Sequence, residues 1–103
     1  MSKLLIVDDD IRLRKLVRTY GEVEHYECDE AADGLAALEK LQVDNFDLVI
    51  LDVMMPGLDG FETLERIRKT SEIPVIMLTA RNEEYDKLTG FGLGVDDYVS
   101  KPF

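Results

Sequence analysis

A chain of 103 residues with 46% hydrophobic content is long enough for one domain with one compact core. The formal net charge of −10 gives a surface that repels phosphate backbones, which excludes direct nucleic-acid binding by this segment. Cys28 is the single cysteine, so an intrachain disulfide and a cysteine zinc cluster are excluded. The apolar run at residues 4–7 is too short for a signal peptide or a membrane span, so we expect a soluble cytoplasmic protein.

The first half of the chain alternates short apolar runs with amphipathic stretches. Residues 4–7 predict a buried strand. Apolar residues then recur with a helical period, which predicts a helix with one apolar face made of Leu13, Leu16, Val17 and Tyr20. Gly21 is expected to end this helix early. Residues 26–29 predict a short second strand, followed by a helix that carries Leu35, Leu38 and Leu41.

A third strand and a third helix are predicted in the middle of the chain. Residues 48–51 form another apolar run, and Pro56 and Gly57 then break the chain. Asp59 and Glu62 have the spacing of a capping box. This signal opens a helix whose inward residues are predicted to be Phe61, Leu64 and Ile67.

The last quarter of the sequence continues the same alternation. Pro74 introduces a fourth strand at residues 75–78, and Asn82 can cap a fourth helix. The apolar residues of that helix are Tyr85, Leu88 and Phe91. Residues 98–99 predict a fifth strand.

The complete pattern is strand–helix repeated four times and closed by a strand. Apolar strands separated by helical crossovers predict an α/β fold with a parallel sheet covered on both faces. The alternation calls for one more helix, but the sequence ends at Phe103. We therefore expect residues 1–103 to be one domain truncated before its fifth helix, with part of one sheet face left open.

Acidic side chains follow two of the predicted strands. Asp8 and Asp9 come after the first strand and Asp52 after the third, while Asp10 is the better candidate for a helix cap. Ligands in open parallel sheets bind at the carboxyl ends of the strands. If the first and third strands are neighbours, the three carboxylates converge within a few ångströms. Thr79 and Lys101 follow the fourth and fifth strands at the same edge.

Three converging carboxylates repel one another and resist ionisation. A hard divalent cation resolves this conflict, and Mg²⁺ prefers oxygen ligands while keeping several waters. The positions occupied by those waters suit phosphate oxygens. With a metal, a lysine and a hydroxyl around one carboxylate, the predicted site has the parts needed for phosphoryl transfer.

Four segments in this order resemble the receiver domains of response regulators in bacterial two-component systems. They are residues 7–9 (Val-Asp-Asp), residues 51–60 (Leu-Asp-Val-Met-Met-Pro-Gly-Leu-Asp-Gly), residues 78–80 (Leu-Thr-Ala) and residues 97–103 (Asp-Tyr-Val-Ser-Lys-Pro-Phe). The resemblance covers essentially the whole chain. It implies a flavodoxin-like, doubly wound five-stranded sheet with strand order 2-1-3-4-5.

The resemblance also implies a role for each matching residue around a bound Mg²⁺ ion. Asp52 resembles the phosphoacceptor. Asp9 resembles the direct metal ligand, and Asp8 the acidic neighbour that acts largely through water. The backbone carbonyl of Met54 would be the third protein ligand.

Three further residues resemble the groups that respond to phosphorylation. Thr79 resembles the hydroxyl that turns inward to bond the phosphoryl group, and Lys101 would pair with a phosphoryl oxygen. Tyr98 resembles the aromatic switch that changes rotamer as Thr79 moves. In this family a sensor histidine kinase donates the phosphoryl group, and phosphorylation biases two pre-existing states.

The sequence is most similar to the winged-helix (OmpR/PhoB-type) transcription-factor branch of this family. In that branch, residues similar to Lys87, Asp96 and Asp97 join a dimer interface, so we expect a homodimer of the full-length protein on phosphorylation. DNA would be bound only through an output domain that is absent from this sequence. A single-domain receiver without an output domain remains open within the same class.

Two other functions are weighed against a phosphorylation switch. An aspartyl-phosphate hydrolase also uses aspartates at strand ends with Mg²⁺, but it requires Asp-x-Asp-x-Thr or Asp-x-Asp-x-Val, and Arg12 stands at the last position here. A receiver-like fold that binds partners without phosphorylation is disfavoured because every expected site residue is present. We therefore expect a phosphoacceptor domain that catalyses only its own phosphorylation and slow dephosphorylation, and not a metabolic enzyme.

Overall fold

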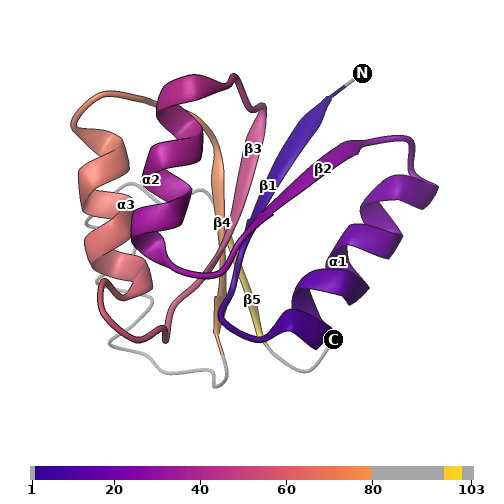
Figure 1. Cartoon of the computed structure of the whole chain (residues 1–103), viewed down its shortest axis with the longest axis horizontal. Helices are drawn as coiled ribbons and strands as arrows, with labels where there is room; N and C mark the ends of the chain where they lie inside the picture. Colours follow the sequence, from indigo (N-terminus) through magenta and orange to yellow (C-terminus); the bar gives the residue numbers. More distant parts are fainter. Residues whose placement is uncertain (1, 80–96, 101–103) are drawn as a thin grey trace.

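The chain folds around a parallel β-sheet, and this computed structural model describes residues 2–79 and 97–100. The sheet has five strands in the order β2-β1-β3-β4-β5, and each neighbouring pair is parallel (Figure 1). This confirms the predicted α/β fold and strand order. The strands are β1 (Lys3–Val7), β2 (Glu27–Ala31), β3 (Leu48–Asp52), β4 (Val75–Thr79) and β5 (Asp97–Ser100).

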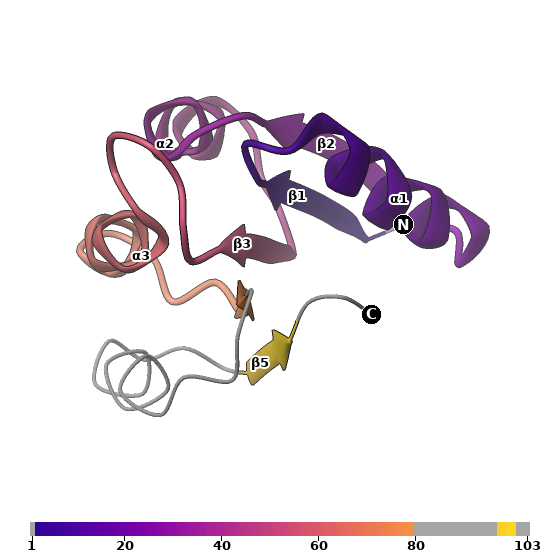
Figure 2. The same cartoon turned by 90° about the horizontal axis from the view of Figure 1, so that it is seen from below.

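Helices cover both faces of the sheet, as expected for a doubly wound fold. Helix α1 (Ile11–Val23) lies on one face, whereas α2 (Gly34–Val43) and α3 (Gly60–Arg68) lie side by side on the other (Figure 2). We call these the α1 face and the α2–α3 face. The fourth helix, predicted around Tyr85, lies outside the described residues. No helix in the described ranges is long and apolar enough to cross a membrane.

Aspartate side chains cap the N-termini of all three described helices. Asp10 accepts a hydrogen bond from the backbone N of Arg12 at 2.9 Å, which confirms its predicted role as a cap. Asp33 caps α2 in the same way. The predicted capping box of α3 is present, because Asp59 accepts from the backbone N of Glu62 and Glu62 accepts from the backbone N of Asp59. These caps fix the residue at which each helix begins.

The larger hydrophobic core lies on the α2–α3 face. Alternate residues of the strands point to this side, as the two-residue period of a strand requires. Leu64 and Ile67 of α3 are buried as predicted, and Phe61 is partly buried. The buried members of this core are Leu5, Val7, Ala31, Ala37, Val49, Leu51, Val53, Met55, Leu64, Val75 and Met77.

Among the described residues the α1 face has a smaller core, and two residues of the predicted apolar face of α1 lie outside it. Its buried residues are Leu4, Ile6 and Cys28, with Val17, Leu48 and Ile50 partly buried against them. Of the predicted apolar face of α1, Val17 is partly buried, whereas Leu16 is 40% exposed and Tyr20 is 61% exposed. The apolar stripe of α1 is wider than the sheet surface that this helix covers. On α2, Leu35 is also exposed.

Helix α1 does not end early at Gly21, as the sequence suggested, but continues to Val23. Gly21 is buried, and a β-carbon there would lie only 2.8 Å from the Sγ atom of Cys28. The glycine therefore lets the helix approach β2 closely and does not act as a terminator. Burial raises the pKa of the Cys28 thiol, which fits its predicted role as a small buried hydrophobe.

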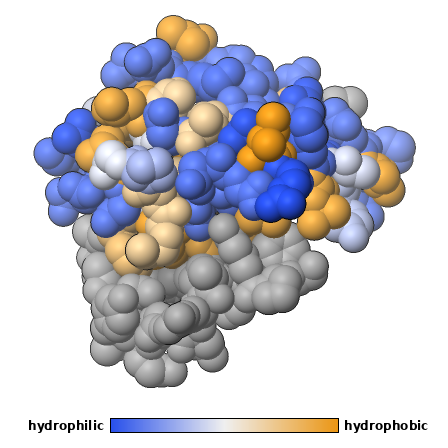
Figure 3. Space-filling view, turned by 60° about the horizontal axis from the view of Figure 1, so that its bottom comes forward, coloured by the Kyte–Doolittle hydropathy of each residue, from blue (hydrophilic) through white to orange (hydrophobic). Residues whose placement is uncertain are grey.

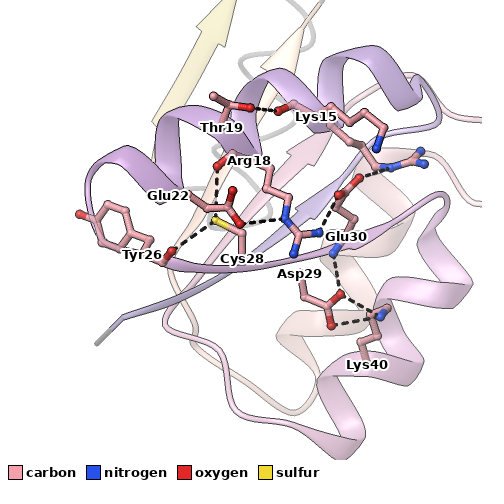
Figure 4. Close-up of polar contacts among 10 residues, drawn as sticks. Lys15, Arg18, Thr19, Glu22, Tyr26, Cys28, Asp29, Glu30 and Lys40 are labelled. Atoms are coloured by element: carbon pink, nitrogen blue, oxygen red, sulfur yellow. Dashed lines mark hydrogen bonds and ion pairs between the residues drawn. The ribbon is translucent and has the colours of Figure 1, made fainter.

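Strand β2 runs from Glu27 to Ala31, later than the predicted residues 26–29. Its charged side chains obscured its extent in the sequence, but Asp29 and Glu30 each have a partner on a neighbouring helix (Figure 4). Asp29 accepts from Nζ of Lys40 on α2, and Glu30 accepts from Arg18 on α1 at 2.8 Å. A carboxylate paired in this way can stand in a strand that is covered on both faces.

Candidate functional site: an acidic cluster at the sheet edge

The carboxyl ends of β1 and β3 bring the predicted aspartates together. These strands are paired in parallel, with Val7 opposite Leu51. Asp8 directly follows β1 and Asp52 is the last residue of β3, so both lie at the carboxyl ends of these neighbouring strands. On this side of the molecule, the described residues form a largely hydrophilic surface (Figure 3).

Asp8, Asp9 and Asp52 form one acidic cluster, as predicted. One carboxylate oxygen from each residue lies within 4.8 Å of the other two. Asp8 is 1% exposed and Asp52 is 3% exposed, whereas Asp9 is exposed to solvent. Two buried carboxylates beside a third, solvent-facing one create a strongly negative site that is open on one side.

Backbone and side-chain contacts hold the Asp8 end of the cluster. The backbone N of Asp8 donates to the carbonyl of Ala31 at 3.2 Å, and Oδ1 of Asp8 accepts from the backbone N of Asp10 at 3.0 Å. Nη1 of Arg14 donates to the backbone carbonyl of Asp8 at 2.7 Å. Arg14 was not among the predicted site residues. Its basic side chain on a helix face next to Val17 was the only signal available in the sequence.

Arg14 belongs to a group of paired charges between α1 and β2. Its Nε donates to Oε1 of Glu30 at 3.0 Å, and Nη1 of Arg18 donates to Oε2 of the same carboxylate at 2.8 Å. We call Arg14, Glu30 and Arg18 the Glu30 network; Figure 4 shows Glu30, Arg18 and the exposed partner of Arg18, Glu22. The hydrogen bond from Arg18, and to a smaller extent the one from Arg14, holds the pKa of Glu30 below its usual value.

The loop after β3 places Asp52 against the start of α3. The backbone N of Gly60 donates to the carbonyl of Val53 at 2.7 Å, and the backbone N of Val53 donates to Leu78 at 3.0 Å. A β-carbon at Gly60 would overlap the backbone oxygen of Asp52. Gly60 is therefore a structural requirement of the site. The sequence pointed to it only as part of a motif.

The other predicted site residues differ in how far the structure describes them. Met54 lies in the loop two residues beyond Asp52 and is 67% exposed, and the predicted role of its backbone carbonyl as a metal ligand stays a prediction. Thr79 ends β4, and Tyr98 lies in β5 opposite Met77. Asp97 is the first residue of β5. Lys87, Asp96 and Lys101 lie outside the described residues.

The donor set fits a hard divalent cation. All three side chains of the cluster offer carboxylate oxygens, which Mg²⁺ and Ca²⁺ prefer over nitrogen or sulfur. The negative charges of close carboxylates repel one another, and a bound cation would offset this repulsion. Asp8, Asp9 and Asp52 could therefore hold a divalent cation.

Comparison with known proteins gives a consistent result. Residues 4–103 match the response regulator receiver domain family. The CpxR homolog of Haemophilus influenzae, a transcriptional regulatory protein, is 54% identical over 103 residues, which are 100% of this chain and 45% of the relative. The transcriptional regulatory protein ResD of Bacillus subtilis is 49% identical over 102 residues, covering 99% of this chain and 42% of ResD.

A solved structure is similar over the whole chain. The response regulator TrrA of Thermotoga maritima, crystallised in complex with Mg²⁺–BeF, is 39% identical with a TM-score of 0.90. The match covers 100% of this chain and 89% of TrrA. The chain spans less than half the length of the two transcriptional regulators that it matches.

The chain belongs to the response regulator receiver domain family. It is a signalling domain, and its function is that of its class, a phosphorylation-activated switch.

Proposed function

We propose that Asp52 accepts a phosphoryl group from the phosphohistidine of a sensor histidine kinase. The observation that carries this proposal is the burial of Asp52 at the end of β3, within 4.8 Å of carboxylate oxygens of Asp8 and Asp9. A buried carboxylate with two acidic neighbours suits a nucleophile that acts beside a bound cation. Asp10, by contrast, is occupied as a helix cap.

The proposed transfer conserves atoms and charge. A carboxylate oxygen of Asp52 forms a bond to phosphorus as the phosphorus–nitrogen bond of phosphohistidine breaks. The bonding electron pair stays on the ring nitrogen, the ring takes up one proton from solvent to leave as neutral histidine, and the product on this chain is an acyl phosphate. A water molecule later attacks phosphorus and releases inorganic phosphate, which regenerates the carboxylate. The domain would thus catalyse only its own phosphorylation and dephosphorylation.

Asp8, Asp9 and Asp52 would hold Mg²⁺, together with the backbone carbonyl of Met54. When bound, Mg²⁺ would neutralise the negative charge that spreads over the phosphoryl oxygens during transfer. The complex of TrrA with Mg²⁺–BeF supports this choice of metal. Asp9 is the exposed member of the cluster and the one that solvent-borne ions meet first.

The remaining roles complete the switch. Thr79 would donate its hydroxyl to the phosphoryl group, Lys101 would pair with a phosphoryl oxygen, and Tyr98 would change rotamer as Thr79 moves. The position of Thr79 at the end of β4, two strands from β1, supports a role at this sheet edge.

In the whole protein we infer transcription regulation in the cytoplasm, with DNA bound by a separate domain. The similarity to the CpxR homolog and to ResD supports this inference. Phosphorylation would favour a homodimer through Lys87, Asp96 and Asp97. The strongly negative net charge of −10 argues against DNA binding by the receiver itself.

The test is phosphorylation with acetyl phosphate, with and without Mg²⁺, followed by intact mass measurement. We expect a Mg²⁺-dependent gain of one phosphoryl group that is absent in Asp52→Asn. Asp47→Asn is the matched control, because the Asp47 carboxylate contacts the backbone of Lys3 at the start of β1. A gain that persists in Asp52→Asn, or no gain in the unsubstituted chain, would refute the proposal. Turnover of small phosphoesters without a stable acyl phosphate would favour a hydrolase.

A further inference from the structure

Arg14 touches the acidic cluster through the backbone and not through a carboxylate. Its side chain is only 13% exposed, and Nη1 donates to the carbonyl oxygen of Asp8 at 2.7 Å. This oxygen belongs to the peptide group that joins Asp8 to Asp9. Because a peptide group is planar, fixing its oxygen also fixes the direction in which the chain continues into Asp9.

Asp9 needs such a constraint more than its neighbours do. Asp8 is buried and held by its own backbone bond to Ala31 and by its carboxylate bond to the backbone of Asp10. Asp9 is exposed, so core packing does not hold its side chain. The Arg14 contact therefore acts on the peptide that leads into Asp9, the member of the cluster whose side chain is exposed.

Arg14 is itself held firmly enough to act as a fixed support. Nε of Arg14 donates to Glu30, whose carboxylate is 18% exposed and also accepts from Arg18. The planar guanidinium can make both of its contacts at once, one to Glu30 and one to Asp8. The Glu30 network thus links β2 and α1 to the carbonyl of Asp8 after β1.

We propose that Arg14 is a positioning residue that orients the Asp8–Asp9 peptide and thereby sets the affinity of the acidic cluster for Mg²⁺. This inference rests on the proposed magnesium site. Groups that orient metal ligands from outside the coordination sphere typically change metal affinity about 10–100-fold when they are removed.

A purely electrostatic role for Arg14 predicts the opposite sign. A guanidinium close to the cluster repels a divalent cation, so its loss alone would strengthen Mg²⁺ binding. A positioning role predicts weaker binding, even for a substitution that retains the positive charge. The direction of the change therefore separates the two explanations.

The experiment measures Mg²⁺ binding by isothermal titration calorimetry for the unsubstituted chain, Arg14→Met and Arg14→Lys. We expect both variants to bind Mg²⁺ about tenfold more weakly. Arg18→Met is the matched control, because Arg18 pairs with the same Glu30 carboxylate but, within the described residues, does not contact Asp8. This variant should bind Mg²⁺ like the unsubstituted chain. Urea unfolding of each variant measures stability in parallel.

A second readout separates positioning from a loss of folded protein. In phosphorylation by acetyl phosphate, the Arg14 variants should need about tenfold more Mg²⁺ for half-maximal rate but recover the normal rate at saturating Mg²⁺. A structural defect would lower the maximal rate and leave the half-saturating Mg²⁺ concentration unchanged. If Arg14→Met is unfolded, Arg14→Lys carries the test, since it keeps the aliphatic stem and the charge.

The outcomes for the inference and for the proposed function are distinct. If the unsubstituted chain binds no Mg²⁺, the proposed function fails. If it binds Mg²⁺ and both Arg14 variants bind equally well or more tightly, the proposed function stands and the positioning role of Arg14 is refuted.

Discussion

The two faces of the sheet are built from the same strands but differ in what covers them. On the α2–α3 face two helices lie side by side, and strand residues such as Leu5, Leu51 and Met77 are fully buried. On the α1 face one helix covers β1 and β2, and Leu48 and Ile50 are only partly buried. The α1 face instead carries the Glu30 network, which reaches the acidic cluster through Arg14. Within the described residues, the α2–α3 face thus holds the larger hydrophobic core, and the α1 face carries the charged residues that contact the site.

The largest expected effect comes from deleting a buried leucine on the α2–α3 face. Leu64→Ala, at a residue with 0% exposure, should lower the free energy of unfolding by about 3–5 kcal/mol, because it removes buried area and leaves a cavity. Leu16→Ala on α1, at a residue with 40% exposure, should cost less than about 1 kcal/mol. Urea unfolding of both variants measures the difference. Equal losses would show that the α1 face is as fully packed as the other.

A smaller difference in stability is expected between alanine substitutions at two glycines, Gly34 on the α2–α3 face and Gly21 on the α1 face. A β-carbon at Gly34 on α2 would overlap Oγ1 of Thr63, which is fully buried and bonded to the carbonyl of Asp59. At Gly21 on α1 the nearest atom would be Sγ of Cys28, at 2.8 Å. We expect Gly34→Ala to cost about 2–3 kcal/mol through overpacking. Gly21→Ala should cost about 1 kcal/mol, because alanine favours the helix interior and offsets part of the strain.

The control for the glycine pair is a double-mutant cycle. Adding Cys28→Ala to Gly21→Ala removes the atom that the new methyl group meets, so the two substitutions should be less destabilising together than the sum of their separate effects. Strict additivity would show that Gly21 is required for another reason. Thermal unfolding of the four proteins of the cycle is sufficient to measure this coupling.

Local signals in the sequence were enough to predict much of the fold. Strands β1, β3 and β4 are continuous apolar runs, and each was predicted to within one residue at either end. The Asp59–Glu62 capping box was also predicted, because its spacing is a property of one helical turn. The convergence of Asp8, Asp9 and Asp52 followed from the rule that parallel strands end at one edge.

What the sequence could not predict depends on contacts between distant residues. Gly21 was taken for a helix end, because nothing in the sequence shows that Cys28 lies against it. The end of β2 was missed because Glu30 is charged, and its partners Arg14 and Arg18 lie on another element. Arg14 was overlooked for the same reason, since its contact to Asp8 exists only after α1 folds back onto β2.

The smallest expected effect concerns the Glu30 network and its dependence on pH. Arg18 and Arg14 hold the pKa of folded Glu30 below the ordinary value of 4.5. The stabilisation that these ion pairs provide is therefore fully present above the pKa of Glu30 in the unfolded chain. It is lost as the pH falls through the lower pKa of Glu30 in the folded chain. In metal-free buffer, Glu30→Gln should lower the free energy of unfolding by about 1 kcal/mol at neutral pH.

This deficit should shrink as the pH falls below about 4.5, because the unsubstituted chain then loses the same ion pairs. Urea unfolding between about pH 7 and pH 3 measures both profiles. Glu22→Gln is the control, since it removes only the exposed pair to Arg18 and should cost a few tenths of a kcal/mol. A deficit in Glu30→Gln that stays constant across this range would mean that the side chain stabilises the α1 face by its shape and hydrogen bonds, without a contribution from its charge.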